Sequence, residues 1–180
     1  MLRVGGLTPL SASDYPGKLA AVVFCQGCAW RCGYCHNPHL LGRRGQREIP
    51  WSEVVAFLER RRGLLDAVVF SGGEPTLQAG LLPAMRQAKA LGYLVGLHTA
   101  GIVPKRLGEV LSLVDWVSMD VKSDFHLHES VTRVRGSGPR ARESYELIRA
   151  SGVACEFHTI DQHNPKSGTD HDFVKNGVRP

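Results

Sequence analysis

The chain has 180 residues and a formal net charge of +5, and its 43% of hydrophobic and 22% of charged residues are ordinary for one globular domain. No apolar run is long enough to cross a bilayer, and the N-terminus lacks the apolar core of a signal peptide, so we expect a cytoplasmic protein with no membrane partner. The basic residues are scattered, and no basic motif is interleaved with aromatics, so we expect no nucleic-acid partner.

Short apolar runs alternate with longer amphipathic runs along the chain. The apolar runs predict strands at residues 19–24, 67–70, 93–99, 116–119 and 153–157. Helical spacing predicts helices at residues 51–62, 81–91, 104–114 and 140–150. This alternation favours an α/β fold with parallel strands joined by right-handed crossovers, and the apolar strands indicate a sheet covered on both faces. Residues 2–18 are expected to form an irregular or short-strand lead-in.

The last part of the chain has a different character. It is polar, rich in turn formers and without a clear period. We therefore predict a core domain over residues 1–157 and a polar, loosely ordered tail over residues 158–180.

Four of the five cysteines fall within eleven consecutive residues, 25–35. An odd number of cysteines in a chain without a secretion signal argues against a disulfide framework and favours a metal site or redox chemistry. Cys28, Cys32 and Cys35 follow the first predicted strand at its carboxyl end, where open α/β folds and barrels gather their chemistry. Three thiolates on so short a loop can ligate three corners of an iron–sulfur cube and leave its fourth iron open.

The cysteines alone leave other interpretations open. Four clustered cysteines could bind structural zinc, although zinc sites usually separate two cysteine pairs by more than the three residues found here. Cys32 and Cys35 could form a thioredoxin-like pair, which would leave Cys28 unexplained. Cys25 is expected to be a buried residue at a strand end, with a smaller chance of being a spare ligand, and Cys155 is expected to be a core residue.

Polar or glycine-rich segments also follow the later strands. Residues 71–75 read Ser-Gly-Gly-Glu-Pro, and glycines there let the backbone approach a ligand closely. The third strand ends in His98–Gly101 and the fourth in Ser118–Lys122, where polar groups either face a ligand or cap helices and close loops. We expect His126 and His128 to lie in a loop, because no third metal ligand is evident beside them.

Taken together, these motifs resemble those of radical S-adenosylmethionine (SAM) enzymes. The Cys-x₃-Cys-x₂-Cys spacing marks that superfamily, and the Gly-Gly-Glu run resembles its second motif. Met119–Lys122 resembles the Asp-x-Lys step of glycyl-radical activating enzymes. Gly5–Pro9 also looks like part of this pattern, and Asp14–Lys18 and Cys35–Pro38 narrow the resemblance to the activating proteins of anaerobic ribonucleoside-triphosphate reductase.

The resemblance implies a fold and a cofactor set. The fold would be a partial, open parallel βα barrel of the radical SAM type, shortened at its C-terminus. It would hold one [4Fe–4S] cluster through Cys28, Cys32 and Cys35, with SAM chelating the open iron. The residues that the resemblance places around SAM are Tyr34 at the adenine, Gly72, Gly73 and Glu74 at the amino group, and Asp120 and Lys122 near a cation site.

The resemblance also implies a reaction. An electron from the cluster would cleave SAM to methionine and a 5′-deoxyadenosyl radical, which would remove a hydrogen atom from a glycine of the reductase. A reduced flavodoxin-like protein is the expected electron donor. The alternatives are activation of another glycyl-radical enzyme, radical chemistry on a small molecule such as a pterin, a zinc-binding interaction module, and a truncated protein that has lost activity.

One feature departs from the longer relatives. They continue past the fifth strand with further strand and helix units, whereas the pattern here ends after Phe157. We therefore expect a truncation or a shifted reading frame in the last segment. The fifth strand would then have an unpaired edge, and we expect lower thermal stability and solubility than in a longer relative.

Overall fold

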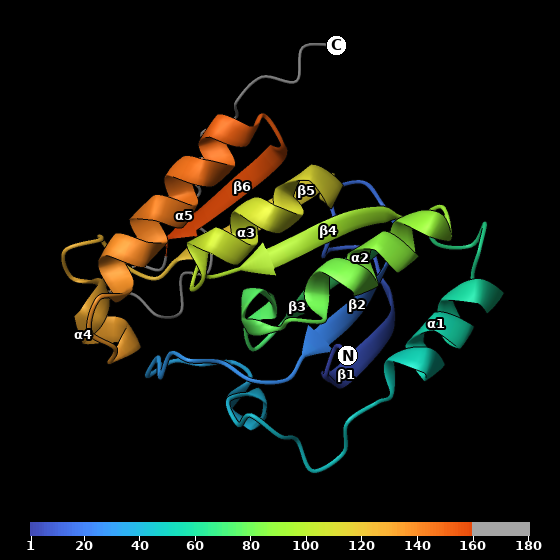
Figure 1. Ribbon diagram of the computed structural model, residues 1–180, viewed down its shortest axis with the longest axis horizontal. Coiled ribbons are helices and arrows are strands. Elements are labelled where there is room, and N and C mark those ends of the chain that lie inside the picture. Colours follow the sequence, from blue (N-terminus) through green and yellow to red (C-terminus); the bar gives the residue numbers. More distant parts are fainter. Residues whose placement is uncertain (160–180) are drawn as a thin grey trace.

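The computed structural model describes residues 1–159. Its strands form one six-stranded sheet in the order β1-β2-β3-β4-β5-β6, in which β2 to β6 are parallel and β1 pairs antiparallel with β2 (Figure 1). The sheet is open, since β1 and β6 are not paired with each other. The predicted fold class, an open α/β sheet built mainly of parallel strands, is confirmed.

The strands agree closely with the apolar runs of the sequence. All five predicted strands are present, and each boundary is within two residues of its prediction. The lead-in contains a further strand of eight residues, β1, and its Pro9 is tolerated because this strand lies at the edge of the sheet. The bounds are β1 (Val4–Ser11), β2 (Ala20–Cys25), β3 (Ala67–Gly72), β4 (Leu94–Thr99), β5 (Trp116–Val121) and β6 (Ala154–Thr159).

The helices form a layer on one face of the sheet, where α1, α2, α3 and α5 follow one another across it (Figure 1). Each corresponds to a predicted helix, and α3 continues into a short 3-10 turn, η3. Three further short helices, η1, η2 and α4, were not predicted. The bounds are η1 (Pro38–Leu40), α1 (Trp51–Arg60), η2 (Pro75–Leu77), α2 (Leu81–Ala90), α3 (Pro104–Val110), η3 (Leu111–Leu113), α4 (His128–Thr132) and α5 (Ser137–Ser151).

The two faces of the sheet are covered differently. Strand side chains on the helix side, such as Val68, Phe70 and Leu97, are fully buried in the main core. The other face, called the inner face below, carries a small separate cluster in which the Tyr15 ring lies 5.2 Å from the Trp116 ring. The sequence predicted a sheet covered on both faces: helices cover one face, and Tyr15, from the connection between β1 and β2, packs on the inner face.

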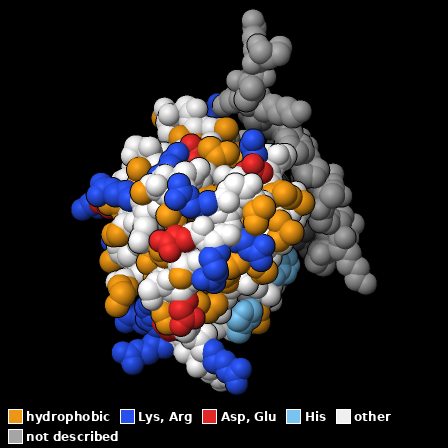
Figure 2. Space-filling view, turned by 90° about the vertical axis from the view of Figure 1, so that its right-hand side faces the viewer, with side chains coloured by type: hydrophobic (Ala, Val, Ile, Leu, Met, Phe, Trp, Pro, Cys, Tyr) orange, Lys and Arg blue, Asp and Glu red, His pale blue; other side chains and the backbone are white. Residues whose placement is uncertain are grey.

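Two surface properties bear on the sequence-based expectations. On the face shown in Figure 2, Lys and Arg side chains are dispersed among neutral and hydrophobic atoms instead of forming one patch. Within residues 1–159, no helix has the length and apolar character needed to span a membrane. The cytoplasmic location stays a prediction, and the predicted tail lies almost wholly outside the described residues.

Candidate cluster and cofactor site

The three motif cysteines lie on one loop at the carboxyl end of β2. This segment, residues 26–37, is called the cysteine loop below. Cys28, Cys32 and Cys35 are half-buried thiols without disulfide partners. Burial raises the pKa of Cys28 to about 11. Burial also raises the pKa of Cys32, and the positive charge of Lys122 opposes that rise.

The other two cysteines lie apart from this loop. Cys25 ends β2 and its side chain is fully buried in the main core, so the predicted placement at a buried strand end is confirmed. Burial raises its pKa, which leaves the thiol neutral. Cys155, in β6, is half-buried and packs at the margin of the same core.

Backbone and side-chain hydrogen bonds hold the cysteine loop on both sides. The Gly27 N–H donates to the Leu40 carbonyl at 2.8 Å, and the Gln26 side-chain amide donates to the Gly42 carbonyl at 2.7 Å. Further along, the Arg31 N–H donates to the Thr132 carbonyl at 2.9 Å, which ties the loop to α4. In Figure 1 the light-blue segment after β2 extends toward α4 in agreement with this contact. The loop is therefore fixed between its cysteines as well as at its start.

The glycine motif packs directly against the cysteine loop. The Gly73 N–H donates to the Cys25 carbonyl and the Glu74 N–H to the Gly27 carbonyl, both at 2.9 Å. A Cβ on Gly72, where φ is +112°, would lie 2.4 Å from the Cys25 nitrogen, and one on Gly73 would lie 2.4 Å from the Gly27 oxygen. Only glycine fits at either position. The structure thus brings the first two predicted motifs into contact.

Glu74 has a role that the sequence did not indicate. Its side chain is fully buried, and its Oε1 accepts hydrogen bonds from Thr99 Oγ1 at 2.7 Å and from both the hydroxyl and the N–H of Thr76. Its Oε2 accepts from the Ala100 N–H at 2.9 Å. Burial raises the pKa of Glu74, and these hydrogen bonds oppose the rise. The carboxylate therefore joins the ends of β3 and β4, and its predicted contact with SAM stays a prediction.

Tyr34, Asp120 and Lys122 come together from two distant segments. The Tyr34 hydroxyl donates to the Lys122 carbonyl at 3.1 Å, and Lys122 Nζ lies 5.9 Å from the centroid of the Tyr34 ring. Lys122 Nζ also donates to Asp120 Oδ2 at 2.6 Å. Burial would raise the pKa of Asp120, but the Lys122 charge outweighs it and holds that pKa below its usual range. These three predicted residues therefore form one charged group near Cys32.

Several polar side chains on the inner face were not predicted as a group. Side chains alternate along a strand, so His98, Asp120 and His158 point to the same face from neighbouring strands. His98 Nε2 bonds the Asp14 carbonyl at 2.9 Å and its ring meets Trp116 edge to face, while burial lowers its pKa. Glu156 lies 3.8 Å from His158 in β6. Alternation of period two along β4 to β6 is the sequence signal that could have identified this set.

His128 differs from its predicted position in a loop. It begins α4 and is fully buried, whereas His126 lies exposed in the preceding turn. Thr99, at the end of β4, was expected either to face a ligand or to close a loop. Its hydroxyl donates its proton to Glu74 and so is not directed toward the inner face. These two residues serve the packing around the cysteine and glycine motifs.

The donor set fits the ligands that a cubane takes. Within residues 1–159, no three His, Cys, Asp or Glu side chains are grouped closely enough to hold one metal ion. A [4Fe–4S] cluster distributes its cysteine ligands over different irons, so they need not converge on one point. Three half-buried thiols on one loop, beside the Lys122 charge that favours thiolate, fit that requirement.

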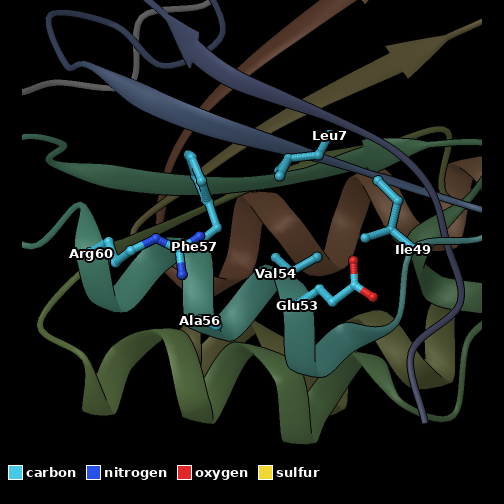
Figure 3. A pocket seen from close by; sticks show the side chains of 7 residues that line it. All are labelled: Leu7, Ile49, Glu53, Val54, Ala56, Phe57 and Arg60. Carbon is cyan, nitrogen blue, oxygen red and sulfur yellow. The ribbon is translucent and has the colours of Figure 1, made fainter.

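A groove lined mainly by apolar side chains lies away from this site. It has a volume of about 420 Å³ and lies between β1 and α1, as Figure 3 shows. Its lining residues are Leu7, Ile49, Glu53, Val54, Ala56, Phe57 and Arg60. None of them belongs to the cysteine loop, the glycine motif or the ends of β4 and β5.

Comparison with known proteins identifies the family. The model of the radical SAM superfamily matches residues 22–163, which is most of the chain. The chain belongs to the radical SAM superfamily. Radical SAM enzymes use a [4Fe–4S] cluster and SAM, so the predicted cofactors are those of the family. Membership also favours the cluster over the zinc and thioredoxin-like interpretations of the cysteines.

Relatives within this superfamily include activating enzymes. A protein of Methanocaldococcus jannaschii described as a glycyl-radical enzyme activating enzyme is 30% identical, with 96% of this chain and 84% of the relative aligned. The pyruvate formate-lyase activating enzyme of Clostridium pasteurianum is 32% identical over 81% of this chain and 62% of its own length. That of Escherichia coli K12 is 29% identical over 73% and 57%. The chain thus spans about three fifths of the pyruvate formate-lyase activating enzymes.

Two solved structures share the fold. QueE of Escherichia coli superposes with a TM-score of 0.55 at 15% identity, covering 89% of this chain and 84% of QueE. SuiB of Streptococcus suis bound to its precursor peptide gives 0.59 at 19% identity, covering 76% of this chain and 31% of SuiB. The open sheet described above is therefore the partial barrel of this superfamily.

Proposed function

We propose that this chain is an activase that uses a [4Fe–4S] cluster and SAM to generate a glycyl radical on anaerobic ribonucleoside-triphosphate reductase. The main support is the meeting of three segments at one edge of the sheet. The glycine motif bonds the cysteine loop through Glu74 and Gly27, and the end of β5 bonds it through Lys122 and Tyr34. A cofactor bound there would lie across the carboxyl ends of parallel strands, where such folds carry their chemistry.

Cys28, Cys32 and Cys35 would be the cluster ligands, and the fourth iron would be left for the amino and carboxylate groups of SAM. When bound, the reduced cluster supplies the electron that splits SAM into methionine and a 5′-deoxyadenosyl radical. The cysteines must be thiolates to bind iron. The positive charge of Lys122 favours the ionised form of Cys32.

The charged group beside the cluster would orient SAM. Asp120 stays ionised because the pKa of its carboxyl lies below its usual range, and it is 46% exposed, so it can accept from a cationic group of the cofactor. Tyr34 would pack against the adenine while its hydroxyl stays bonded to the Lys122 carbonyl. The backbone of Gly72 and Gly73, kept against the cysteine loop, would hold the SAM amino group.

The reductase is the proposed target because two segments of the chain resemble its activating proteins. Asp14–Lys18 is one, and it contributes Tyr15 and the Asp14 carbonyl to the cover of the inner face. Cys35–Pro38 is the other, and it closes the cysteine loop onto η1. The relatives that activate glycyl-radical enzymes support the reaction type.

A reduced flavodoxin-like protein is the proposed electron donor. Arg31 and Arg133 are exposed, and both lie at the cysteine loop: Arg31 donates to the Cys28 carbonyl at 2.7 Å, and a Cβ on Gly33 would lie 3.4 Å from the Arg133 guanidinium. Positive charge at this place suits an acidic redox partner.

The proposal is tested by mixing the anaerobically reconstituted chain, SAM and dithionite with candidate targets. We expect the electron paramagnetic resonance doublet of a glycyl radical with anaerobic ribonucleoside-triphosphate reductase, and none when its target glycine is replaced by alanine. A doublet with pyruvate formate-lyase alone would show that the target is another glycyl-radical enzyme and would overturn the choice of the reductase. SAM cleavage that is stimulated only by a pterin would replace protein activation with small-molecule chemistry.

A further inference from the structure

Two buried ring nitrogens, one in the cysteine loop and one in α4, have no hydrogen-bond partner among the described residues. They are Nε1 of Trp30, between Cys28 and Cys32, and Nε2 of His128 in α4. Trp30 is 1% exposed and His128 is 0% exposed. Their rings meet edge to face, with centroids 4.8 Å apart and planes at 71°. Unpaired buried polar atoms are uncommon and costly, so two of them on touching rings require an explanation.

The hydrogen bonds around His128 determine which of its nitrogens carries the proton. Thr132 Oγ1 donates to the His128 carbonyl at 2.9 Å, because a carbonyl can only accept. The Thr132 proton is thereby used, so Ser137 Oγ, at 2.7 Å, donates to Thr132 Oγ1. The Ser137 proton is used in turn, so Ser137 Oγ accepts from His128 Nδ1 at 3.2 Å.

His128 Nδ1 is therefore the protonated nitrogen. Burial, with a smaller effect of the Lys122 charge, lowers the pKa of His128 to about 4, so the imidazole is neutral at pH 7. A neutral imidazole has one N–H, which leaves Nε2 as a hydrogen-bond acceptor. Trp30 Nε1 can only donate. The two unpaired atoms are thus one donor and one acceptor on adjacent rings.

We propose that Trp30 Nε1–H donates a hydrogen bond to His128 Nε2 and that this bond latches the cysteine loop to α4. The two rings touch edge to face with their centroids 4.8 Å apart, so the donor and the acceptor lie on adjacent buried side chains. In this arrangement Trp30 is a positioning residue for Cys28 and Cys32. This consequence rests on the proposed cluster site, whereas the bond itself does not.

The proposed bond between Trp30 and His128 adds to a backbone hydrogen bond that already joins the cysteine loop to α4 at the next residue, Arg31. The Arg31 N–H donates to the Thr132 carbonyl at 2.9 Å, and Thr132, the last residue of α4, is followed by Arg133 in a left-handed conformation with φ of +56°. The Arg133 N–H is held by the Glu129 carbonyl at 2.8 Å. Residues 30 and 31, halfway between two cluster ligands, are then fixed to α4 through both side chain and backbone. This fixes the separation of Cys28 and Cys32.

The bond can be observed directly by nuclear magnetic resonance of the full ¹⁵N-labelled chain, before and after cluster loading. We expect a scalar coupling through the hydrogen bond between the Trp30 indole nitrogen and His128 Nε2, together with slow solvent exchange of the indole proton. Absence of this coupling in both states, with both nitrogens assigned, would overturn the proposal.

A double-mutant cycle tests the consequence for the cluster. We expect Trp30→Phe and His128→Phe each to speed the loss of iron to a chelator by about tenfold, because each leaves a buried partner unsatisfied. The doubly substituted chain should lose iron no faster than the worse single variant. Each single variant should also alter the magnetic resonance spectrum of the reduced cluster, which a general loss of stability would not do.

Trp51→Phe is the matched control. It removes an indole N–H that donates to Gln87 Oε1 at 2.7 Å, away from the cysteine loop, and it should leave iron loss unchanged. Equal effects in this control, or additive effects in the double variant, would contradict the latch. A chain that shows the ¹⁵N coupling but binds no iron would refute the proposed function and leave the hydrogen bond established.

Discussion

For Glu74, the role predicted from the sequence differs from the contacts that its side chain makes in the structure. The sequence shows it only as part of a Gly-Gly-Glu motif, and the motif suggests a contact with SAM. The structure adds four donors from Thr76, Thr99 and Ala100, and the last two residues lie 25 and 26 positions away at the end of β4. No local pattern could reveal those partners, because they depend on which strand lies beside β3.

Glu74→Gln tests this structural role. Glutamine has only one oxygen to accept with, and its amide would face N–H and hydroxyl donors, so we expect the free energy of unfolding to fall by about 2 kcal/mol. The effect should appear in the iron-free chain without SAM, measured by urea denaturation. Glu59→Gln, on the exposed end of α1, is the control. Unchanged stability in Glu74→Gln would mean that the carboxylate is reserved for the cofactor.

Because His128 is buried, we expect the stability of the folded chain to depend on pH in the acid range. Its pKa falls from 6.5 to about 4 on folding, so between these values the unfolded chain takes up a proton that the folded chain does not. The free energy of unfolding should therefore drop as the pH falls from 6.5 to 4, by at most about 3 kcal/mol. Denaturation across this range should show a shallower pH dependence in His128→Phe. Parallel curves for the two proteins would contradict the buried neutral state.

At the scale of elements, the contact between the glycine motif and the cysteine loop organises the site. Gly73→Ala would place a Cβ 2.4 Å from the Gly27 oxygen and 3.0 Å from the Leu40 oxygen, both backbone atoms that cannot turn aside. We expect iron content and SAM cleavage to fall at least tenfold, as measured by iron analysis and product chromatography.

Gly108→Ala provides the control for this substitution. Gly108 lies in α3, and a Cβ there meets nothing within 4 Å. Alanine should be neutral, or should stabilise the helix by up to about 1 kcal/mol. A Gly73→Ala protein with normal iron content would show that the two loops can separate without harm.

A helix or strand could be predicted from the sequence where its own residues specify it, and could not where it depends on packing against distant segments. Buried parallel strands such as β3 have continuous apolar runs, which is why their positions could be predicted from the sequence. β1 contains two glycines and a proline, and its pairing with β2 gives it a regular form that its own residues do not specify. α4 has only five residues and no apolar period, so its existence depends on packing against α5 and the cysteine loop.

At the scale of the whole molecule, the site belongs to no single element. It forms where β2, β3, β4 and β5 end side by side, and their order in the sheet follows their order in the sequence. The strand-end motifs could therefore be placed together from the sequence, since parallel strands share one carboxyl edge. The side-chain partners across that edge could not, because they depend on twist and on the packing of the loops.

Cofactor binding at this shared edge should stabilise the entire fold. A ligand at one hundred times its dissociation constant adds about 2.7 kcal/mol to the free energy of unfolding. For a chain of this size that corresponds to a rise in Tm of roughly 5–10 °C. We expect this shift on adding SAM to the cluster-loaded protein in anaerobic calorimetry, and none in Cys35→Ala. A shift of equal size in Cys35→Ala would place SAM elsewhere on the molecule.

The central claim is that Cys28, Cys32 and Cys35 alone hold a cluster that cleaves SAM. The most direct measurement is iron content, together with methionine and 5′-deoxyadenosine yield under dithionite, for alanine variants of these three cysteines and of Cys155. We predict that Cys155→Ala matches the unmodified chain, with about four irons per chain and the two products in equal amounts. Each of the other three variants should lose both cluster and products. Unchanged iron and product yield in any of those three would contradict the account.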